Sequence, residues 1–148
     1  MPFRHADRSH GLTTRIELEV RERLEEAIDY VCLEALVQRR RARGLPPPAA
    51  DSAADRREYT EHVTALLTRL EALVAELPEA QRGPVRAAAP GEDEAARRMR
   101  VQVTLARALP DYWQRFEAVS ARYLAEPGDS GESGRDGRGL LARLFGRG

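Results

Sequence analysis

The chain has 148 residues, and its 24 basic side chains balance 24 acidic ones, so its formal net charge is zero. This length is enough for one domain and its tails. A chain that wraps nucleic acid usually carries a clear positive excess, so the charge balance predicts no nucleic-acid partner. All 24 basic residues are Arg, and Lys and Asn are absent. This bias follows GC-rich codons and indicates a bacterial genome, so the use of Arg is not by itself evidence for phosphate recognition.

The cellular compartment is predicted from three features of the sequence. Cys32 is the only cysteine, which excludes an intramolecular disulfide and fits a reducing cytosol. The N-terminal segment lacks the apolar core of a signal peptide, and no run of 18 apolar residues could cross a bilayer. The sequence therefore predicts a cytoplasmic protein.

The first residues allow two interpretations. Residues 1–12 are polar, charged and without periodicity, and we expect a disordered arm there. Apolar and polar residues alternate over 12–20, which is a strand pattern. Thr14 followed by Glu17, however, matches a helix capping box, and helical spacing continues well beyond it. Because a single strand has no partner within the chain, we predict a helix from Thr14 onward. The alternative is a strand that pairs with its copy in a dimeric regulator.

The predicted first helix ends in the run Arg39-Arg40-Arg41-Ala42-Arg43-Gly44. The helix dipole favours cations near a C-terminus, and a following glycine favours the left-handed cap. We interpret the run as a solvated helix cap, and the alternative is a patch that binds an anion or a phospholipid. Three prolines at 46–48 then predict an extended linker.

The second predicted helix, capped by Asp51 or Ser52, carries the most regular apolar pattern in the chain. Its apolar residues recur at alternating spacings of four and three, a heptad seam that predicts packing against another helix. Pro78 should end it, and residues 78–91, rich in Pro and Gly, are predicted to form a loop. Because three helices make a thin core, we predict self-association, most simply as a dimer. The self-association residues are Val63, Leu66, Leu70, Leu73 and Leu77.

A third helix is predicted to begin at the acidic residues 92–94 and to continue to Tyr123. Pro110 lies inside this pattern and cannot donate a backbone hydrogen bond, so we expect a kink there. The aromatic face around Trp113 is interpreted as core, with a ligand groove as the alternative. Together these elements predict an all-α fold: a small antiparallel bundle of three long helices over residues 13–126.

The sequence contains no motif that identifies a catalytic or cofactor site. His62 lies beside the seam with Glu58 four residues before it, whereas the helical Glu–His pairs that bind two metals are spaced three apart. Cys32 falls on the apolar face of the first helix, where no His is placed to activate it. We therefore predict no catalytic residue, no cofactor, no metal ligand, and no hydrolytic or redox turnover.

The end of the sequence differs from the rest. Residues 127–138 are rich in Gly, Ser and charged side chains and predict a flexible linker. Residues 139–148 then form a separate amphipathic peptide. On a helical wheel its apolar residues share one face that arginines flank, which is typical of basic peptides that bind membranes or partner grooves. The predicted contact residues are Leu140, Leu141, Arg143, Leu144, Phe145 and Arg147.

This peptide resembles the C-terminal membrane-targeting tail of the bacterial Min-system division-site ATPase. In that tail a Gly precedes two bulky apolar residues, a basic residue, Leu-Phe and Gly, a pattern that residues 139–146 follow here. Ala142 replaces a charged position, and the chain lacks the nucleotide-binding domain of that ATPase. The resemblance implies a mode of attachment, peripheral at the inner face of the membrane, and it does not bear on activity.

The sequence thus predicts a non-enzymatic helical adaptor or scaffold. It would form a homo-oligomer, and its tail would recruit it to an anionic membrane surface or to a larger protein assembly. One alternative is a ligand- or metal-handling bundle, ferritin-like in general character, in which the aromatic face and His62 line a pocket. Another is a cargo protein that docks on a bacterial shell through its C-terminal peptide.

Overall fold

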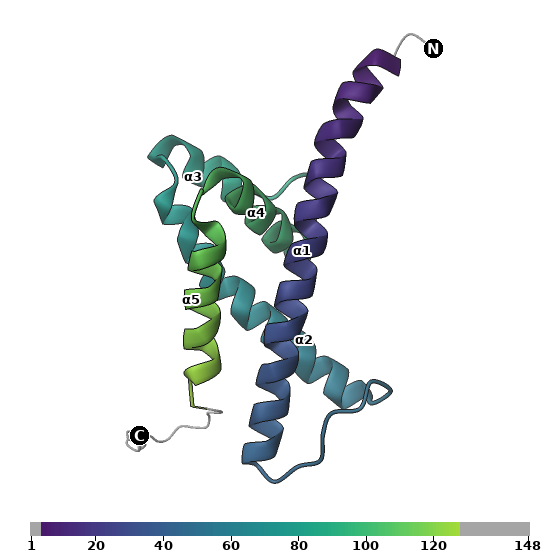
Figure 1. Cartoon of the computed structure of the whole chain (residues 1–148), viewed down its shortest axis with the longest axis vertical. Coiled ribbons are helices and arrows are strands. Elements are labelled where there is room, and N and C mark those ends of the chain that lie inside the picture. Colours follow the sequence, from purple (N-terminus) through teal and green to yellow (C-terminus); the bar gives the residue numbers. More distant parts are fainter. Residues whose placement is uncertain (1–3, 128–148) are drawn as a thin grey trace.

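The structure is a computed structural model that describes residues 4–127. Within this range the prediction of an all-α fold is confirmed, because every regular element is a helix (Figure 1). The predicted linker from residue 128 on and the tail 139–148 lie outside the described residues. The elements are α1 (Arg4–Ala42), α2 (Ala53–Leu70), the 3₁₀ helix η1 (Glu71–Glu76), α3 (Glu79–Arg86), α4 (Glu94–Ala108) and α5 (Tyr112–Ala125).

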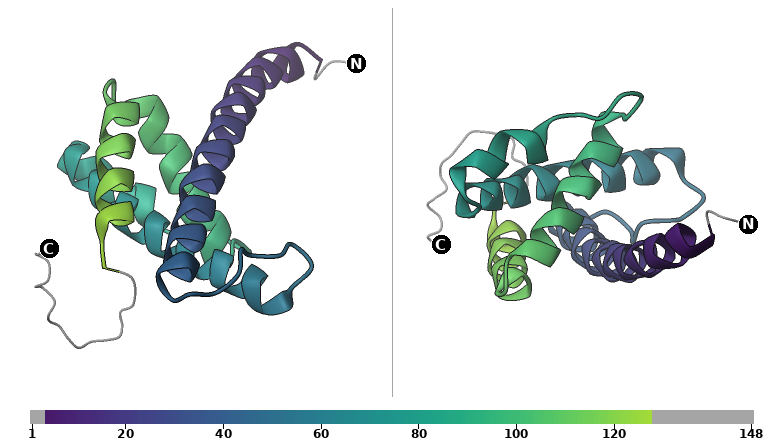
Figure 2. Two further views of the ribbon diagram at one scale, coloured as in Figure 1. Left: turned by 60° about the horizontal axis from the view of Figure 1, so that its bottom comes forward. Right: turned by 90° about the horizontal axis from the view of Figure 1, so that it is seen from above.

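Helix α1 is longer than predicted, and its N-terminal part projects beyond the other helices (Figures 1 and 2). It begins at Arg4 and not at Thr14, so the predicted disordered arm is helical from Arg4 on. Near the base of this projection, Ile16 and Leu18 are 49% and 52% exposed. The alternation over 12–20 that resembled a strand is therefore part of a helix whose apolar residues alternate without a neighbouring sheet.

The other end of α1 stops as the sequence predicts. Gly44 adopts a positive φ of 71°, a conformation that glycine reaches without steric strain. The backbone N–H of Leu45 donates to the carbonyl of Arg40, and that of Gly44 donates to the carbonyl of Arg41. These two bonds are those of a Schellman cap, so the last carbonyls of α1 are satisfied by its own backbone.

Helix α2 begins at the predicted cap, where Ser52 Oγ accepts from the backbone N–H of Asp55. It tightens into η1 after Leu70, and the chain becomes extended at Leu77, just before Pro78. The seam faces inward: Leu66, Leu70, Leu73 and Leu77 are at most 7% exposed, and Val63 is half-buried. The partner helices predicted by the seam are thus α1, α4 and α5 of the same chain. A second copy could reach these leucines only if the domain rearranged.

Two predictions between Pro78 and Tyr123 are wrong. The predicted loop of 78–91 contains the short helix α3, which tolerates Pro84 in its last turn. Pro110 does not kink one long helix but separates α4 from α5. Leu109 is extended, with ψ of 118°, because the ring of a following proline disfavours the helical conformation. The bundle therefore has shorter and more numerous helices than the three predicted.

The core is one continuous cluster contributed by all helices except α3. Leu24, Leu66, Leu70, Val101 and Leu105 have no exposed surface in the folded chain. One polar pair lies among these apolar residues: the Tyr112 hydroxyl donates to Gln102 Oε1 at 2.8 Å, which satisfies both buried groups. Across the described residues, no helix combines the length and apolar character needed to cross a membrane.

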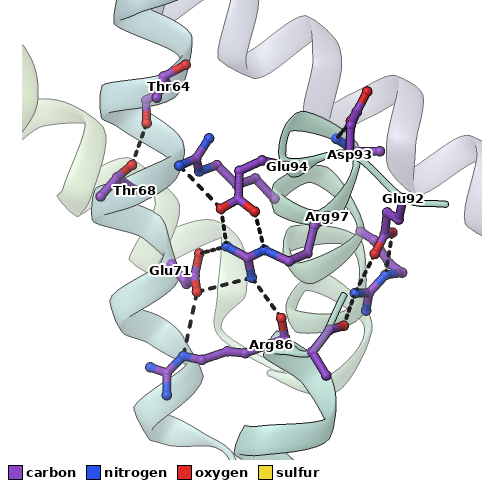
Figure 3. Close-up of polar contacts among 12 residues, drawn as sticks. Thr64, Thr68, Glu71, Arg86, Glu92, Asp93, Glu94 and Arg97 are labelled. Carbon is purple, nitrogen blue, oxygen red and sulfur yellow. Dashed lines mark hydrogen bonds and ion pairs between the residues drawn. The ribbon is translucent and has the colours of Figure 1, made fainter. Parts of the chain in front are cut away.

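A network of charged side chains fastens α4 to η1 and to the end of α3 (Figure 3). At its centre Arg97 Nη2 lies 3.0 Å from Glu71 Oε1 and 2.8 Å from Glu94 Oε2. Arg97 Nη1 also donates to the Arg86 carbonyl at 3.0 Å. Bidentate arginine–carboxylate pairs fix geometry better than single contacts, so this network sets how α4 lies on η1.

Candidate functional site

A polar site lies where the C-terminal turns of α1 meet α2 and the end of α5. It is a cavity of about 380 Å³ that is open on one side. The order of helices explains its composition: α1 contributes its terminal arginines, α2 a histidine and two glutamates, and α5 a tyrosine. The lining residues are Arg39, Ala42, Arg43, Glu58, Glu61, His62, Ala65 and Tyr123.

Three of these side chains form a hydrogen-bonded cluster at the inner wall. His62 is 7% exposed and Tyr123 is 2% exposed. The Tyr123 hydroxyl lies 2.6 Å from His62 Nδ1. Arg39 Nη1 donates to the same hydroxyl at 3.2 Å, and Arg39 Nη2 donates to the Tyr123 carbonyl at 3.0 Å. Because the three residues come from α1, α2 and α5, the cluster joins three helices.

This geometry favours one of the two neutral tautomers of His62. Arg39 Nη1 is an obligatory donor, and it lies 3.2 Å from Nδ1 as well as from the tyrosine oxygen. A proton on Nδ1 would face the Arg39 donor, whereas an unprotonated Nδ1 can accept the hydrogen of the Tyr123 hydroxyl and face Arg39 without conflict. The neutral ring must then carry its proton on Nε2. Burial, reinforced by the positive charges of Arg39 and Arg43, lowers the pKa of His62 to about 4, so the ring is neutral at pH 7.

The arginines at the end of α1 have different environments, and the interpretation of the whole run as a solvated cap is wrong for two of them. Arg40 is 12% exposed in its side chain and pairs with Asp55 at 2.8 Å. Arg39 is half-buried, and its guanidinium lies 4.7 Å from the centre of the Tyr123 ring. Only Arg41 and Arg43 are exposed, as a solvated cap would require. Arg39 and Arg40 therefore make tertiary contacts with α2 and α5 that a solvated cap would not make.

The other residues that the sequence singled out have structural roles or are not described. Tyr112 and Phe116 are core residues, and Trp113 packs beside them with Arg23 stacked 3.9 Å from its ring. The interpretation of the aromatic face as core is therefore confirmed for Tyr112 and Phe116. The predicted contact residues of the tail, from Leu140 to Arg147, lie outside the described residues.

Cys32 and the carboxylates near His62 lie apart from one another in the described part of the chain. The Cys32 thiol is fully buried, and burial raises its pKa to about 12, so it is protonated and a poor nucleophile. Glu58, four residues before His62, lies instead near Arg43, at 3.3 Å. No three side chains of the metal-binding types gather in the described range.

Sequence reasoning identified His62 but missed Arg39 and Tyr123 as its partners. A signal for both was present. Arg39 continues the inward-facing spacing of Cys32 and Ala35 by one helical turn, and Tyr123 lies seven residues after the buried Phe116. A polar residue on an apolar stripe near a helix end predicts a buried hydrogen bond. What the sequence could not provide is the convergence of the three helices.

Comparisons with known proteins identify no family for this arrangement. No family model matches the chain, and neither a curated protein nor a solved structure shows significant similarity to it.

Proposed function

We propose that the chain is a non-enzymatic adaptor or scaffold. Its helical domain would hold a partner protein or a second copy of the chain, and residues 139–148 would recruit it to an anionic membrane surface or to a larger protein assembly. The observation that supports this proposal is the projection of α1 beyond the rest of the domain (Figures 1 and 2). A domain that only had to fold would not need these turns.

The projecting turns offer a contact surface that leaves the core intact. Residues 15–19 are all exposed, including Ile16 and Leu18, and the link to the domain there is the pair between Glu17 and Arg107 of α4, at 2.9 Å. A helix without tertiary contacts is only marginally stable in water, so a partner on these turns would stabilise them. Self-association is therefore proposed through this part of α1 and not through the buried seam.

The tail peptide would act through multiplicity. Burying a Leu or Phe side chain fully contributes roughly 1.5–3 kcal/mol, and ordering the backbone costs about 1–2 kcal/mol per residue. A single short peptide should thus bind a membrane weakly, with Arg143 and Arg147 adding about 1 kcal/mol each near anionic lipid. Several tails on one oligomer would bind far better because their effective concentration is high.

The test is co-sedimentation with vesicles of neutral lipid, with and without added anionic lipid, at low and high salt. The full chain is compared with a Leu144→Asp variant and with a matched Ser130→Asp control, which adds the same charge to the predicted linker. We expect the full chain and the control to sediment with anionic vesicles, and the Leu144→Asp variant to stay in solution. Equal sedimentation of all three proteins would contradict the proposal that the tail binds membranes. A tail that ignores lipid but retains a protein partner would favour assembly docking, as a shell cargo does.

A further inference from the structure

The inner wall of the cavity beside His62 presents a hydrogen-bond donor that the domain does not use. The tautomer that the Arg39 donor favours has Nδ1 accepting from Tyr123 and the proton of the neutral ring on Nε2. No hydrogen bond from Nε2 is formed within residues 15–127, although the side chain is 93% buried and lines the cavity. Among the described residues only Ser120 Oγ is a fully buried side-chain polar atom without a partner, so His62 Nε2 keeps contact with solvent in the open cavity. There it can donate to an acceptor from outside the chain.

A positive charge without a matching carboxylate lies next to this donor. In the described part of the chain three nearby arginines are paired: Arg40 with Asp55, Arg43 with Glu58, and Arg69 with Glu126. Arg39 has no carboxylate within ion-pair distance among the same residues, and its partners are the neutral groups of Tyr123 and His62. The guanidinium is partly desolvated, which strengthens its attraction for an anion.

The rest of the lining limits the size and charge of that anion. Glu58 is occupied by Arg43, but Glu61 is exposed at the rim and adds a negative charge that would repel a dianion. Ala42 and Ala65 line the cavity with methyl groups and leave room for a small apolar body. A phosphate would find too much negative charge here, whereas a monocarboxylate would neutralise Arg39.

We propose that this cavity binds a small organic carboxylate, whose oxygens accept from His62 Nε2–H and the Arg39 guanidinium while its carbon body lies against Ala42 and Ala65. The site is independent of the recruitment peptide, so either proposal can fail alone. The Tyr123 hydroxyl is a positioning group: it fixes the tautomer that puts the donor into the cavity.

The test is an NMR titration of the isotopically labelled full chain at pH 7 with sodium butyrate, and separately with sodium phosphate, at constant ionic strength. We expect butyrate to give a saturable shift of the His62 ring nitrogens and of the Ala42 and Ala65 amides, with phosphate at least tenfold weaker. Arg39→Gln should weaken butyrate binding at least tenfold. The matched control, Arg41→Gln, removes an exposed arginine of the same run and should leave binding unchanged.

A second variant keeps the test decisive if Arg39→Gln fails to fold. His62→Phe retains a buried ring but removes the donor, and the Ala42 and Ala65 amides should then lose the butyrate response. The proposal is overturned if butyrate causes no saturable shift, if either variant binds it as well as the wild type, or if phosphate binds more tightly.

Discussion

Two half-buried arginines hold this domain together in different ways. Arg97 joins α4 to η1 and α3 with two carboxylates, Glu71 and Glu94, within 3.0 Å (Figure 3). Arg39 joins α1 to α2 and α5, but within the described residues its hydrogen-bond partners are neutral. Two carboxylates of the domain neutralise the charge of Arg97, whereas no carboxylate among the described residues pairs with Arg39. Both arginines make several hydrogen bonds, so the number of bonds does not distinguish them. They differ in whether a carboxylate is paired with the guanidinium.

Both clusters rest on the same core, so removing a core side chain should have the largest effect. Leu70 has no exposed surface and lies along the chain between His62 and Glu71. We expect Leu70→Ala to lower the free energy of unfolding by about 2–5 kcal/mol, because it removes buried apolar contacts and leaves a cavity. Urea denaturation measures this change. Leu33→Ala, at a position 42% exposed, is the control and should change it far less. Equal losses would contradict the inward orientation of the seam.

The neutral histidine should make the Arg39 cluster sensitive to acid. Burial lowers the pKa of His62 from its usual value of 6.5 to about 4. Between these values the unfolded chain binds a proton that the folded chain does not. The contribution is therefore complete above pH 6.5 and is lost as the pH falls toward 4. We expect this group to lower the free energy of unfolding by at most about 3 kcal/mol between pH 7 and pH 4.

The control for this acid sensitivity is His62→Phe, which keeps a ring but cannot titrate. Carboxylates elsewhere titrate in the same range, so the difference between the wild type and the variant is the measured quantity. Urea denaturation at several pH values gives it. Parallel curves for the two proteins would show that His62 does not carry the effect.

The Arg97 cluster should respond to salt instead. Its central side chain is 12% exposed and its partner Glu71 is 20% exposed. We expect Arg97→Gln to lower the free energy of unfolding by about 1–2 kcal/mol, because two carboxylates lose a charged hydrogen-bond partner. The loss should shrink in high salt, which screens partly exposed charges. A loss that does not change with salt would contradict an electrostatic origin.

The smallest effect is expected at the exposed pair between Arg107 and Glu17, whose side chains are 38% and 50% exposed. Arg107→Gln should change the free energy of unfolding by no more than about 0.5 kcal/mol, since exposed ion pairs contribute little. The measurement is the same urea denaturation. A loss as large as that of Arg97→Gln would show that this pair anchors the projecting part of α1 to α4.

Local patterns in the sequence predicted much of the fold, and tertiary contacts account for what they missed. The heptad spacing around Leu70 placed α2 and η1 and their buried face, and Gly44 marked the end of α1. The heptad pattern could not show whether the seam packs against helices of the same chain or of a second copy, because both kinds of packing require the same spacing of apolar residues. Pro110 predicted a disruption of the helix, but a kink and a break begin with the same residue in the sequence. The structure has a break, with Leu109 extended at the end of α4 and Asp111 preceding α5.

The candidate site was predictable only in part. His62 attracted attention as a polar residue beside the seam, yet its partners come from positions 23 and 61 residues away along the chain. The helix dipole already accounts for an arginine at the C-terminus of α1. The sequence therefore gave no reason to predict that Arg39 is half-buried. Sequence reasoning fails here because a cap and a buried cluster use the same residue type at the same helix end.

The central claim is that His62 is neutral at pH 7, with its proton on Nε2 and its Nδ1 accepting from Tyr123. A long-range ¹H–¹⁵N correlation spectrum of the histidine side chains tests it directly, followed from pH 8 to pH 4. We expect a protonated Nε2 and an unprotonated Nδ1 at pH 7, with titration only near pH 4 and a change of tautomer population in Tyr123→Phe. A proton on Nδ1 at pH 7, or titration near the ordinary value of 6.5, would contradict it.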